Sequence, residues 1–208
     1  MRRANVQLAA DRRSEIIAAA QTCFARSGFH QTSMQEICAE AGMSPGNLYR
    51  YFRSKEEIIA AFAERDRAGA AQQFAAVGQG DFFEGLAALA QHHLVERSLE
   101  EVALCAEIMA ESRRNPTIAK IMGEFDIDVK ERLITMLRSA QARGDIARDA
   151  DIGIAVEMLM IIADGVWWRR AVDPKFDAEA VLPMFFDITR YMLLDRGKGR
   201  SSEPGETS

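Results

Sequence analysis

One nine-residue stretch of the sequence combines residue types that bind DNA. Residues 44–52 read SPGNLYRYF and bring a glycine, an amide, two phenols and a guanidinium together. A tyrosine hydroxyl donates well to a phosphate oxygen, and Asn47 and Arg50 have donors for phosphates or for base edges. Gly46 has no side chain, so a helix carrying it can bring its backbone close to a base edge. The stretch therefore predicts a contact with double-stranded DNA.

A short helix has to present these side chains, and the sequence supplies both its start and its buried face. Ser44 is a favourable N-cap, and Pro45 suits the first helical position, where a missing N–H costs nothing. On a helical wheel the apolar pair Leu48 and Phe52 lies opposite the glycine, the first tyrosine and the arginine. An eight-residue helix is ~12 Å long, about the width of the major groove.

Two further helices are expected to frame the short one. Ser33 and Glu36 have the spacing of a capping box, and Gly42 in the following turn is typical of a helix-turn-helix unit. Thr32 and Ser33 lie at the amino end of the second helix, where free N–H groups suit a phosphate. Lys55 lies at the start of the fourth helix. Phosphate contacts on both sides would position the short helix in the groove.

The whole sequence predicts an all-α chain of about nine helices, because helical spacing recurs and strand alternation does not. Residues 1–10 are expected to form a mobile arm, residues 78–80 a hinge and residues 197–208 a disordered tail. Pro183 should kink the last helix or mark its start. The expected helices span about 12–27, 33–42, 44–52, 54–77, 81–97, 100–113, 116–143, 151–172 and 177–194.

Charge divides the sequence into a basic head and an acidic body. The net charge is −5, but residues 1–55 hold eight Lys and Arg against four Asp and Glu, which leaves +4 there and −9 on the rest. A basic head can approach phosphates, whereas an acidic body repels them.

Other features of the sequence argue against several classes of protein. Its three cysteines are widely spaced in apolar helical contexts, which is typical of reduced, buried thiols, although redox sensing through Cys105 stays open. Its apolar runs are far shorter than the ~20 residues of a membrane span, so we expect a cytoplasmic protein with no membrane partner. There is no Gly-rich phosphate loop, no GxSxG motif and no metal-ligand cluster, so we expect neither an enzyme nor a cofactor or metal.

A dense pattern of individual residues runs through residues 12–60. It consists of Arg13, Ile16, Ile17, Ala20, Phe24, Gly28, Phe29, Thr32, Met34, Ile37, Ala41, Gly42, Met43, Ser44, Gly46, Leu48, Tyr49, Tyr51, Phe52, Ser54, Lys55 and Glu56. This pattern resembles the amino-terminal signature of the TetR/AcrR family of transcriptional regulators. The resemblance implies an all-helical homodimer whose head binds a palindromic operator and whose body binds a small molecule.

The resemblance also implies particular boundaries and contacts. It places the DNA-binding domain at residues 11–57, the ligand-binding and dimerisation domain at 58–195 and the tail at 196–208. Pro45 stands where some members have a polar or basic residue, and Arg50 is variable in the family, so these two are expected to set this chain's own operator preference. The candidate DNA-binding residues are Thr32, Ser33, Ser44, Pro45, Gly46, Asn47, Tyr49, Arg50, Tyr51 and Lys55.

The body is expected to hold a small hydrophobic or aromatic effector. Ten methionines and two adjacent tryptophans suit a soft, adaptable pocket, although ordinary core packing explains the same residues. Asp164 could pair with a cationic ligand or with a neighbouring arginine. The candidate ligand-binding residues are Phe62, Leu86, His93, Cys105, Met109, Phe125, Met136, Asp164 and Trp168.

The last two helices carry more apolar surface than one chain needs, and by resemblance they pack against their copies in a dimer. The candidate interface residues are Ile154, Met158, Ile161, Phe185, Ile188 and Tyr191. The leading hypothesis is a ligand-responsive repressor, released from its operator when an effector favours a dimer with misplaced reading helices. The alternative is a helical small-molecule binding module without DNA-binding activity.

Overall fold

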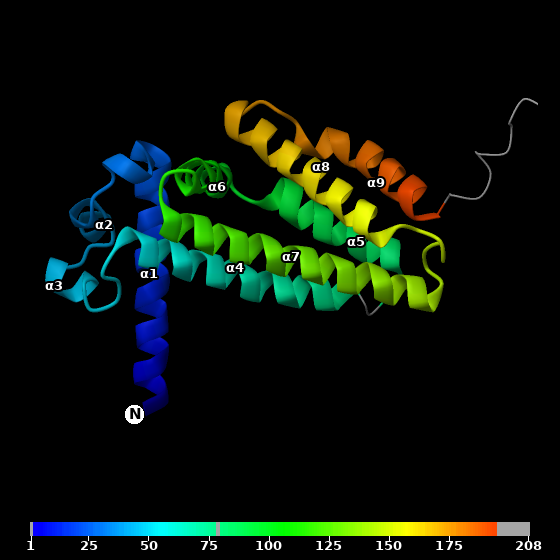
Figure 1. Ribbon diagram of the computed structural model, residues 1–208. Coiled ribbons are helices and arrows are strands. Elements are labelled where there is room, and N and C mark those ends of the chain that lie inside the picture. Colours follow the sequence, from blue (N-terminus) through cyan, green and yellow to red (C-terminus); the bar gives the residue numbers. More distant parts are fainter. Residues whose placement is uncertain (1, 78–79, 195–208) are drawn as a thin grey trace, which may run out of the picture. The chain divides into compact units, whose positions relative to one another are not determined.

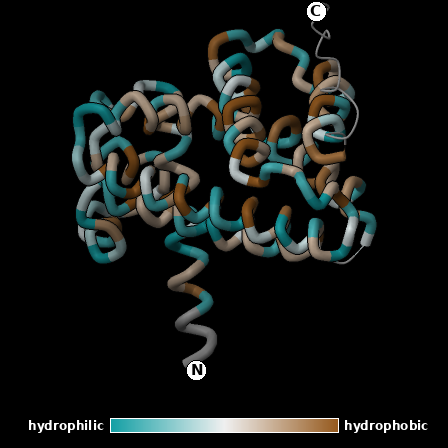
Figure 2. Tube along the Cα trace, turned by 45° about the vertical axis from the view of Figure 1, so that its right-hand side comes forward, coloured by the Kyte–Doolittle hydropathy of each residue, from teal (hydrophilic) through white to brown (hydrophobic). Residues whose placement is uncertain are grey.

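The computed structural model describes residues 2–77 and 80–194, and over these ranges the chain forms helices without a single strand (Figure 1). Hydrophobic and hydrophilic stretches alternate along the helices (Figure 2), as expected when each helix buries one face. The all-α prediction is confirmed. The elements are α1 (Arg2–Gln31), α2 (Met34–Glu40), α3 (Pro45–Leu48), α4 (Lys55–Val77), α5 (Phe82–Gln91), the π-helical turn η1 (His92–Glu96), α6 (Leu99–Ser112), α7 (Pro116–Arg143), α8 (Ile152–Val172) and α9 (Ala178–Leu194).

The structure corrects the expected start of the first helix and decides where the last helix begins. Helix α1 begins at Arg2 rather than near residue 12, since residues 2–10 are rich in Ala, Leu, Gln and Arg, which favour helix over a mobile arm. Helix α9 begins at Ala178 and runs on through Pro183, so the helix does not start at that proline. Of the predicted hinge, residues 78 and 79 lie outside the described residues, and so does the predicted tail at 197–208.

Contacts group the chain into two compact units. The first comprises Met1–Gln72, Arg97–Val129 and Trp167–Phe176, and the second comprises Gln73–Glu96, Lys130–Val166 and Asp177–Ser208. The domain boundary expected between residues 57 and 58 stays a prediction. None of the described helices is both long and apolar enough to cross a membrane.

The first unit has one continuous apolar core that includes the head and part of α6. Helix α1 packs along both α2 and α6. Fully buried side chains of α1, α2 and α3 share this core with Leu104 and Ile108 of α6 and with Ile118 of α7. The helix-turn-helix unit is therefore built directly onto α6. The largest buried side chains of this core include Ile16, Phe24, Ile37, Leu48 and Phe52 of the head and Ile58 and Ile59 of α4.

In the second unit, α9 packs against α5 and η1. The backbone N–H of Ala147 donates to the carbonyl of Leu193, with an N···O distance of 2.8 Å, which ties the turn before α8 to the end of α9. Gly85 fits tightly because a Cβ there would lie 2.9 Å from the backbone of Val77. A larger residue at this position would push the end of α4 away from α5.

Candidate nucleic-acid interface

Helix α2 begins at the capping box that the sequence predicts. The Glu36 backbone N–H donates to the Ser33 hydroxyl at 3.2 Å, and the Ser33 backbone N–H donates to a Glu36 carboxylate oxygen at 2.6 Å. The Ser33 hydroxyl lies 2.9 Å from the same carboxylate oxygen. Hydrogen bonds from the backbone and hydroxyl of Ser33 lower the pKa of Glu36 below its ordinary value. The exposed Ser33 is thus already committed to its own helix start, and a phosphate would have to compete with Glu36 for it.

Thr32 points into the protein instead of toward solvent. It is 2% exposed, and its hydroxyl lies 2.8 Å from the carbonyl oxygen of Gly28 and 3.1 Å from that of Cys23. These contacts satisfy backbone groups at the end of the regular part of α1. The Thr32 hydroxyl, a candidate phosphate donor in the sequence, is therefore not available for a phosphate and instead fixes where α2 starts.

The turn between α2 and α3 has the helix-turn-helix geometry expected around Gly42. Gly42 has a φ of +61°, in the left-handed region that favours glycine. The Met43 N–H donates to the carbonyl of Cys38 at 3.0 Å, and the Cys38 thiol lies 2.7 Å from the Met43 carbonyl oxygen. Both bonds close the turn and set the direction in which α3 leaves it.

Helix α3 is shorter than predicted. Regular helix covers only Pro45–Leu48, and the chain continues to Phe52 in tight turns, whose N–H groups bond to carbonyls either three or four residues back. Proline and glycine in the first turn are poor helix formers, so the regular hydrogen bonding ends early. Ser44 occupies the N-cap as expected, but its side chain makes no capping hydrogen bond. Its exposed hydroxyl therefore stays available to a phosphate.

The two faces of the segment from α3 to Phe52 separate as the helical wheel predicts. Leu48 and Phe52 are 0% and 1% exposed and belong to the core of the first unit, whereas Tyr49 is 49% exposed. Tyr51 is half-buried and packs against the core. Of the other candidate DNA contacts on this segment, Asn47 is half-buried, and Ser44, Pro45, Gly46 and Arg50 are exposed.

Gly46 has no structural reason of its own to be a glycine. Its φ is not positive, and a Cβ built on it would meet nothing within 4 Å. Any small side chain would fit the isolated chain and would favour the helix. A glycine here instead leaves the helix backbone bare on its exposed face, where a partner can approach closely.

Arg13 holds the end of this segment, a role that sequence reasoning did not assign. Its guanidinium donates to the carbonyl oxygen of Tyr51 at 3.2 Å and lies 4.3 Å from the centre of the Phe52 ring. The contact joins α1 to the turn after α3 across 38 residues of sequence. Such a cation–π contact adds to the burial of the ring and helps to fix the orientation of the exposed face.

Lys55 is placed differently from the prediction. Its ammonium donates to the carbonyl oxygens of Phe29 and, at 3.5 Å, of His30, and it lies 4.3 Å from the centre of the Phe29 ring. Burial lowers the pKa of this partly buried lysine. The ammonium has three protons, so one can still reach a phosphate, but its first role in the free protein is to cap the end of α1.

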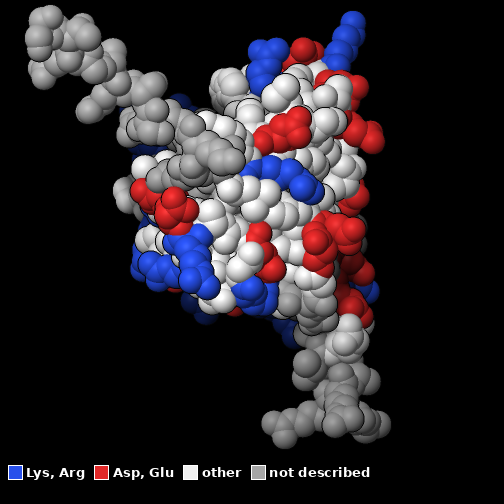
Figure 3. Space-filling model, turned by 90° about the vertical axis from the view of Figure 1, so that its right-hand side faces the viewer, with Lys and Arg blue, Asp and Glu red and all other residues white. Residues whose placement is uncertain are grey.

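The described arginines of the head differ in whether they are paired with a carboxylate. Arg12 pairs with Glu15 and Arg26 with Glu40, whereas the exposed Arg50 makes no ion pair with any described residue, nor does Arg53. On the face of the molecule drawn in Figure 3, in contrast, acidic side chains gather along one edge. Unpaired positive charge thus accompanies the exposed tyrosine and glycine of α3.

The candidate ligand-binding residues are divided between the two units and differ in exposure. Phe62 lines a narrow apolar crevice in the first unit with Ile17, Phe24 and Leu104. Burial raises the pKa of the Cys105 thiol to about 12, which makes it a poor redox sensor. In the first unit, Phe62 is buried, Cys105 and Phe125 are half-buried, and Met109 and Trp168 are exposed; in the second, Leu86 and Met136 are buried, and His93 and Asp164 are exposed.

Most candidate dimer residues lie in solvent on the isolated chain. Ile154, Met158 and Ile161 of α8 are 55%, 37% and 60% exposed. On α9, Ile188 and Tyr191 are 39% and 69% exposed. Phe185 is different, because it is 7% exposed and packs edge-on against its neighbour Phe186 within the chain.

Two family models match the chain. Residues 16–62 match the model described as bacterial regulatory proteins of the tetR family, and residues 84–190 match the C-terminal domain described as a BetI-type transcriptional repressor. The first match covers α2, α3 and the capping contacts described above, and the second covers most of the helices that follow.

Individual proteins are similar over most of the chain. The HTH-type transcriptional regulator UidR of Escherichia coli is 32% identical over 154 residues, which are 74% of this chain and 79% of UidR. The structure of GusR from Salmonella enterica has 31% identity and a TM-score of 0.75, covering 88% of this chain and 95% of GusR. The structure of SmeT with triclosan has 26% identity and a TM-score of 0.74, covering 95% and 100%; SmeT is described as the repressor of a Stenotrophomonas maltophilia multidrug efflux pump.

Proposed function

The chain belongs to the tetR family of bacterial regulatory proteins and is a DNA-binding transcriptional regulator, and we propose that it is a repressor that an effector releases from a palindromic operator. It is not an enzyme, since both matched domains and the related proteins are transcriptional regulators. We propose further that it acts in the cytoplasm, where its DNA target lies.

The exposed face of α3 is the observation that carries the operator proposal. Leu48 and Phe52 anchor the segment in the core, which leaves Gly46, Tyr49 and Arg50 toward solvent. The open space around Gly46 lets the backbone of α3 approach base edges, while the tyrosine hydroxyl and the guanidinium supply donors. Arg50 and the neighbouring Pro45 are the positions from which this chain's operator preference would come.

A two-fold dimer follows from the size of this reading element. One short helix contacts too few bases for specificity, whereas two copies related by a two-fold axis read two half-sites of a palindrome. Three apolar side chains of α8 recur at spacings of four and three and are all exposed: Ile154, Met158 and Ile161. On α9 the same spacing relates Met184, Ile188 and Tyr191, which are 62%, 39% and 69% exposed. Such stripes fit a helical dimer interface.

The dimer is tested with Ile161→Glu, which places a charge in the middle of the proposed α8 stripe. Analytical ultracentrifugation should give twice the chain mass for the wild type and a single chain mass for the variant. Ile127→Glu is the control, because Ile127 is 58% exposed on α7, outside the proposed interface. A wild-type protein of single chain mass at micromolar concentration, or an equal effect of both substitutions, would contradict the proposal.

The effector is proposed to be a small hydrophobic or aromatic molecule. Seven of the ten methionines lie in the body, and methionine side chains adapt readily to apolar ligands. The related SmeT was solved with triclosan, so triclosan is a practical first probe for this chain. Mass spectrometry of the protein purified under non-denaturing conditions would identify a bound compound. An effector that fits the proposal must reduce operator affinity when it is added back.

Operator binding itself is tested by an electrophoretic mobility shift with a duplex from the region upstream of the protein's own gene. We expect retardation by the wild type that weakens steeply as salt rises, because phosphate contacts release counterions. Tyr49→Ala should lose most of the retardation. Lys120→Ala is a matched control, because Lys120 is an exposed cation on α7. No retardation by the wild type at low salt would leave the alternative of a small-molecule binding module without DNA binding.

A further inference from the structure

Three consecutive residues, Gly28, Phe29 and His30, form a joint between the regular part of α1 and the start of α2. Gly28 has a φ of +74° and a ψ of 164°, so the helix breaks there although it resumes immediately. The carbonyl of Gly28 accepts from the Thr32 hydroxyl, and the carbonyls of Phe29 and His30 accept from the Lys55 ammonium. The joint is thus fastened on its head side by the residues that start α2 and α4.

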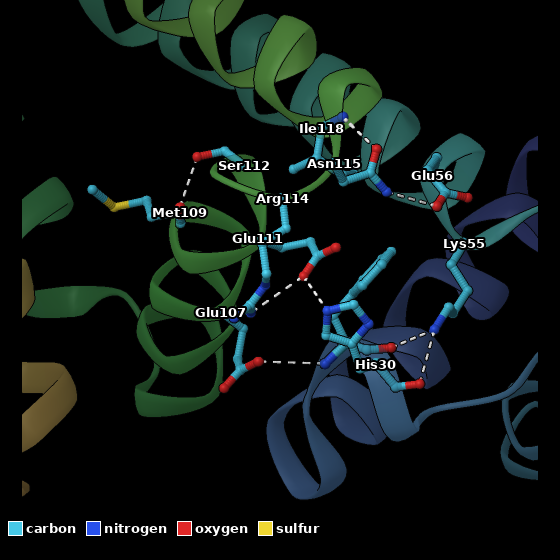
Figure 4. A network of polar contacts seen from close by, with 11 residues as sticks. His30, Lys55, Glu56, Glu107, Met109, Glu111, Ser112, Arg114, Asn115 and Ile118 are labelled. Atoms are coloured by element: carbon cyan, nitrogen blue, oxygen red, sulfur yellow. Dashed lines mark hydrogen bonds and ion pairs between the residues drawn. The ribbon is translucent and has the colours of Figure 1, made fainter.

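Helix α6 fastens the same joint from its other side (Figure 4). A carboxylate oxygen of Glu107 accepts from the backbone N–H of Phe29 at 3.4 Å, and a carboxylate oxygen of Glu111 lies 2.6 Å from Nε2 of His30. The two glutamates are four residues apart, so they project from the same face of α6. A Cβ on Gly28 would lie 3.2 Å from the Glu107 carboxylate, so only glycine leaves this contact undisturbed.

The contact between Glu111 and His30 is costly to break. Its side chain is only 4% exposed, and its other ion-pair partner, Arg114, is at 3.5 Å and lies largely in solvent. A buried carboxylate is costly unless it is paired, so separation of α6 from His30 is strongly resisted. The joint and this turn of α6 are therefore expected to move together.

A second attachment ties the turn between α6 and α7 to the start of α4. The side-chain amide of Asn115 donates to a carboxylate oxygen of Glu56 at 3.0 Å, and its carbonyl oxygen accepts from the first backbone N–H groups of α7. Glu56 directly follows Lys55, which holds the joint. The last turn of α6 and the turn that follows it are therefore each fixed to a residue next to the helix-turn-helix unit, Glu111 to His30 and Asn115 to Glu56.

We propose that Glu107 and Glu111 are positioning residues through which α6 sets the orientation of α2 and α3. This inference rests on the proposed function, because it concerns how the DNA-reading face is regulated. Helix α6 also carries Cys105 and Met109, two of the candidate effector residues. An effector that displaces α6 would pull on the joint, and the two carboxylates would pass that displacement to the start of α2. The effector can shift the equilibrium between the two positions of α6 only by the difference in its binding free energy for them.

The test compares alanine and glutamine at the two positions. Glutamine keeps a carbonyl oxygen that accepts from the Phe29 amide or from His30, whereas alanine removes the acceptor. Fluorescence anisotropy with the upstream duplex should show about a tenfold loss of affinity for Glu107→Ala and Glu111→Ala, within the usual range of coupling between sites. Glu107→Gln and Glu111→Gln should stay within about threefold of the wild type. Glu100→Ala, on the exposed first turn of α6, is the control and should bind like the wild type.

A second readout is independent of DNA. Hydrogen exchange of the free protein should be faster over residues 29–40 in Glu107→Ala than in Glu100→Ala, because the end of α1 and all of α2 lose one fixed side. Glu107 is exposed, so this variant should fold even if Glu111→Ala does not.

The outcomes separate this inference from the proposed function. Alanine variants that bind DNA like the wild type, or glutamine variants as weak as the alanine ones, would overturn the inference and leave the regulator intact. A wild type that fails to bind any upstream duplex would overturn the proposed function, and hydrogen exchange then decides on the joint alone. Equal exchange over residues 29–40 in Glu107→Ala and Glu100→Ala would overturn the inference about the joint.

Discussion

Gly46→Ala should move stability and DNA affinity in opposite directions. In the structure a Cβ at this position meets nothing within 4 Å, and φ is not positive, so alanine fits without strain. Replacing a helical glycine by alanine stabilises by about 0.5–1 kcal/mol, and a position in the first turn of α3 should lie near the lower value. The melting temperature should therefore rise by about 1–2 °C for a chain of this size.

DNA binding should weaken in the same variant, because the added methyl group projects from the face that approaches the bases. We expect a loss of about tenfold, or ~1.4 kcal/mol, if it holds the helix off from close contact. Circular dichroism melts measure the first effect, and fluorescence anisotropy with the upstream duplex measures the second.

Gly69→Ala is the matched control for this prediction. Gly69 is exposed within α4, and a Cβ there also meets nothing within 4 Å. It should raise the melting temperature without changing DNA affinity. A Gly46→Ala protein that binds DNA as tightly as the wild type would refute the argument that Gly46 serves close approach of α3 to DNA.

Three further predictions test the parts that hold the reading face. Thr32→Val should lower stability by about 1–2 kcal/mol in thermal melts, because it removes the buried hydroxyl that lies within hydrogen-bonding distance of the backbone carbonyls of Gly28 and Cys23, whereas Thr22→Val, exposed on α1, should change it little. Because the pKa of Glu36 is lowered, its hydrogen bonds to Ser33 stabilise the fold above pH 4.5, and this stabilisation is lost as the pH falls further. The difference in melting temperature between the wild type and Glu36→Gln should therefore shrink from pH 7 to pH 3. An unchanged difference would contradict this prediction. With the pKa of Cys105 raised to about 12, a variant that keeps only this cysteine should react with a thiol reagent at pH 8 much more slowly when folded than when unfolded, and equally rapid reaction of the folded protein would contradict the argument.

Local signals predicted the helices and the reading face well. The capping box at Ser33 and Glu36, the turn at Gly42 and the opposite faces of Leu48 and Tyr49 all depend on residues within one or two turns, and all three were confirmed. The amino-terminal part of α1 is helical and not the mobile arm that we predict from the sequence, because its Ala, Leu, Gln and Arg residues have high helix propensities. Intrinsic propensity was the better guide there.

The roles of individual head residues were harder to predict, because they depend on contacts that are distant in sequence. Lys55 reaches a carbonyl 26 residues away, and Glu107 reaches an amide 78 residues away. No pattern in one sequence shows that a lysine at a helix start caps another helix, or that two glutamates on α6 face the end of α1. Two glutamates four residues apart in the second half of α6 were the available signal, and only the fold shows which residues they contact.

Hydroxyl-radical footprinting of the upstream duplex tests the central claim most directly, that two copies of the exposed face of α3 read DNA. We predict two protected segments related by a palindrome and centred about 10 base pairs, or a multiple of that, apart. The protection should disappear in Tyr49→Ala, whose side chain is exposed at the centre of that face. Protection that persists unchanged in Tyr49→Ala, or no protection by the wild type at any upstream position, would contradict the account.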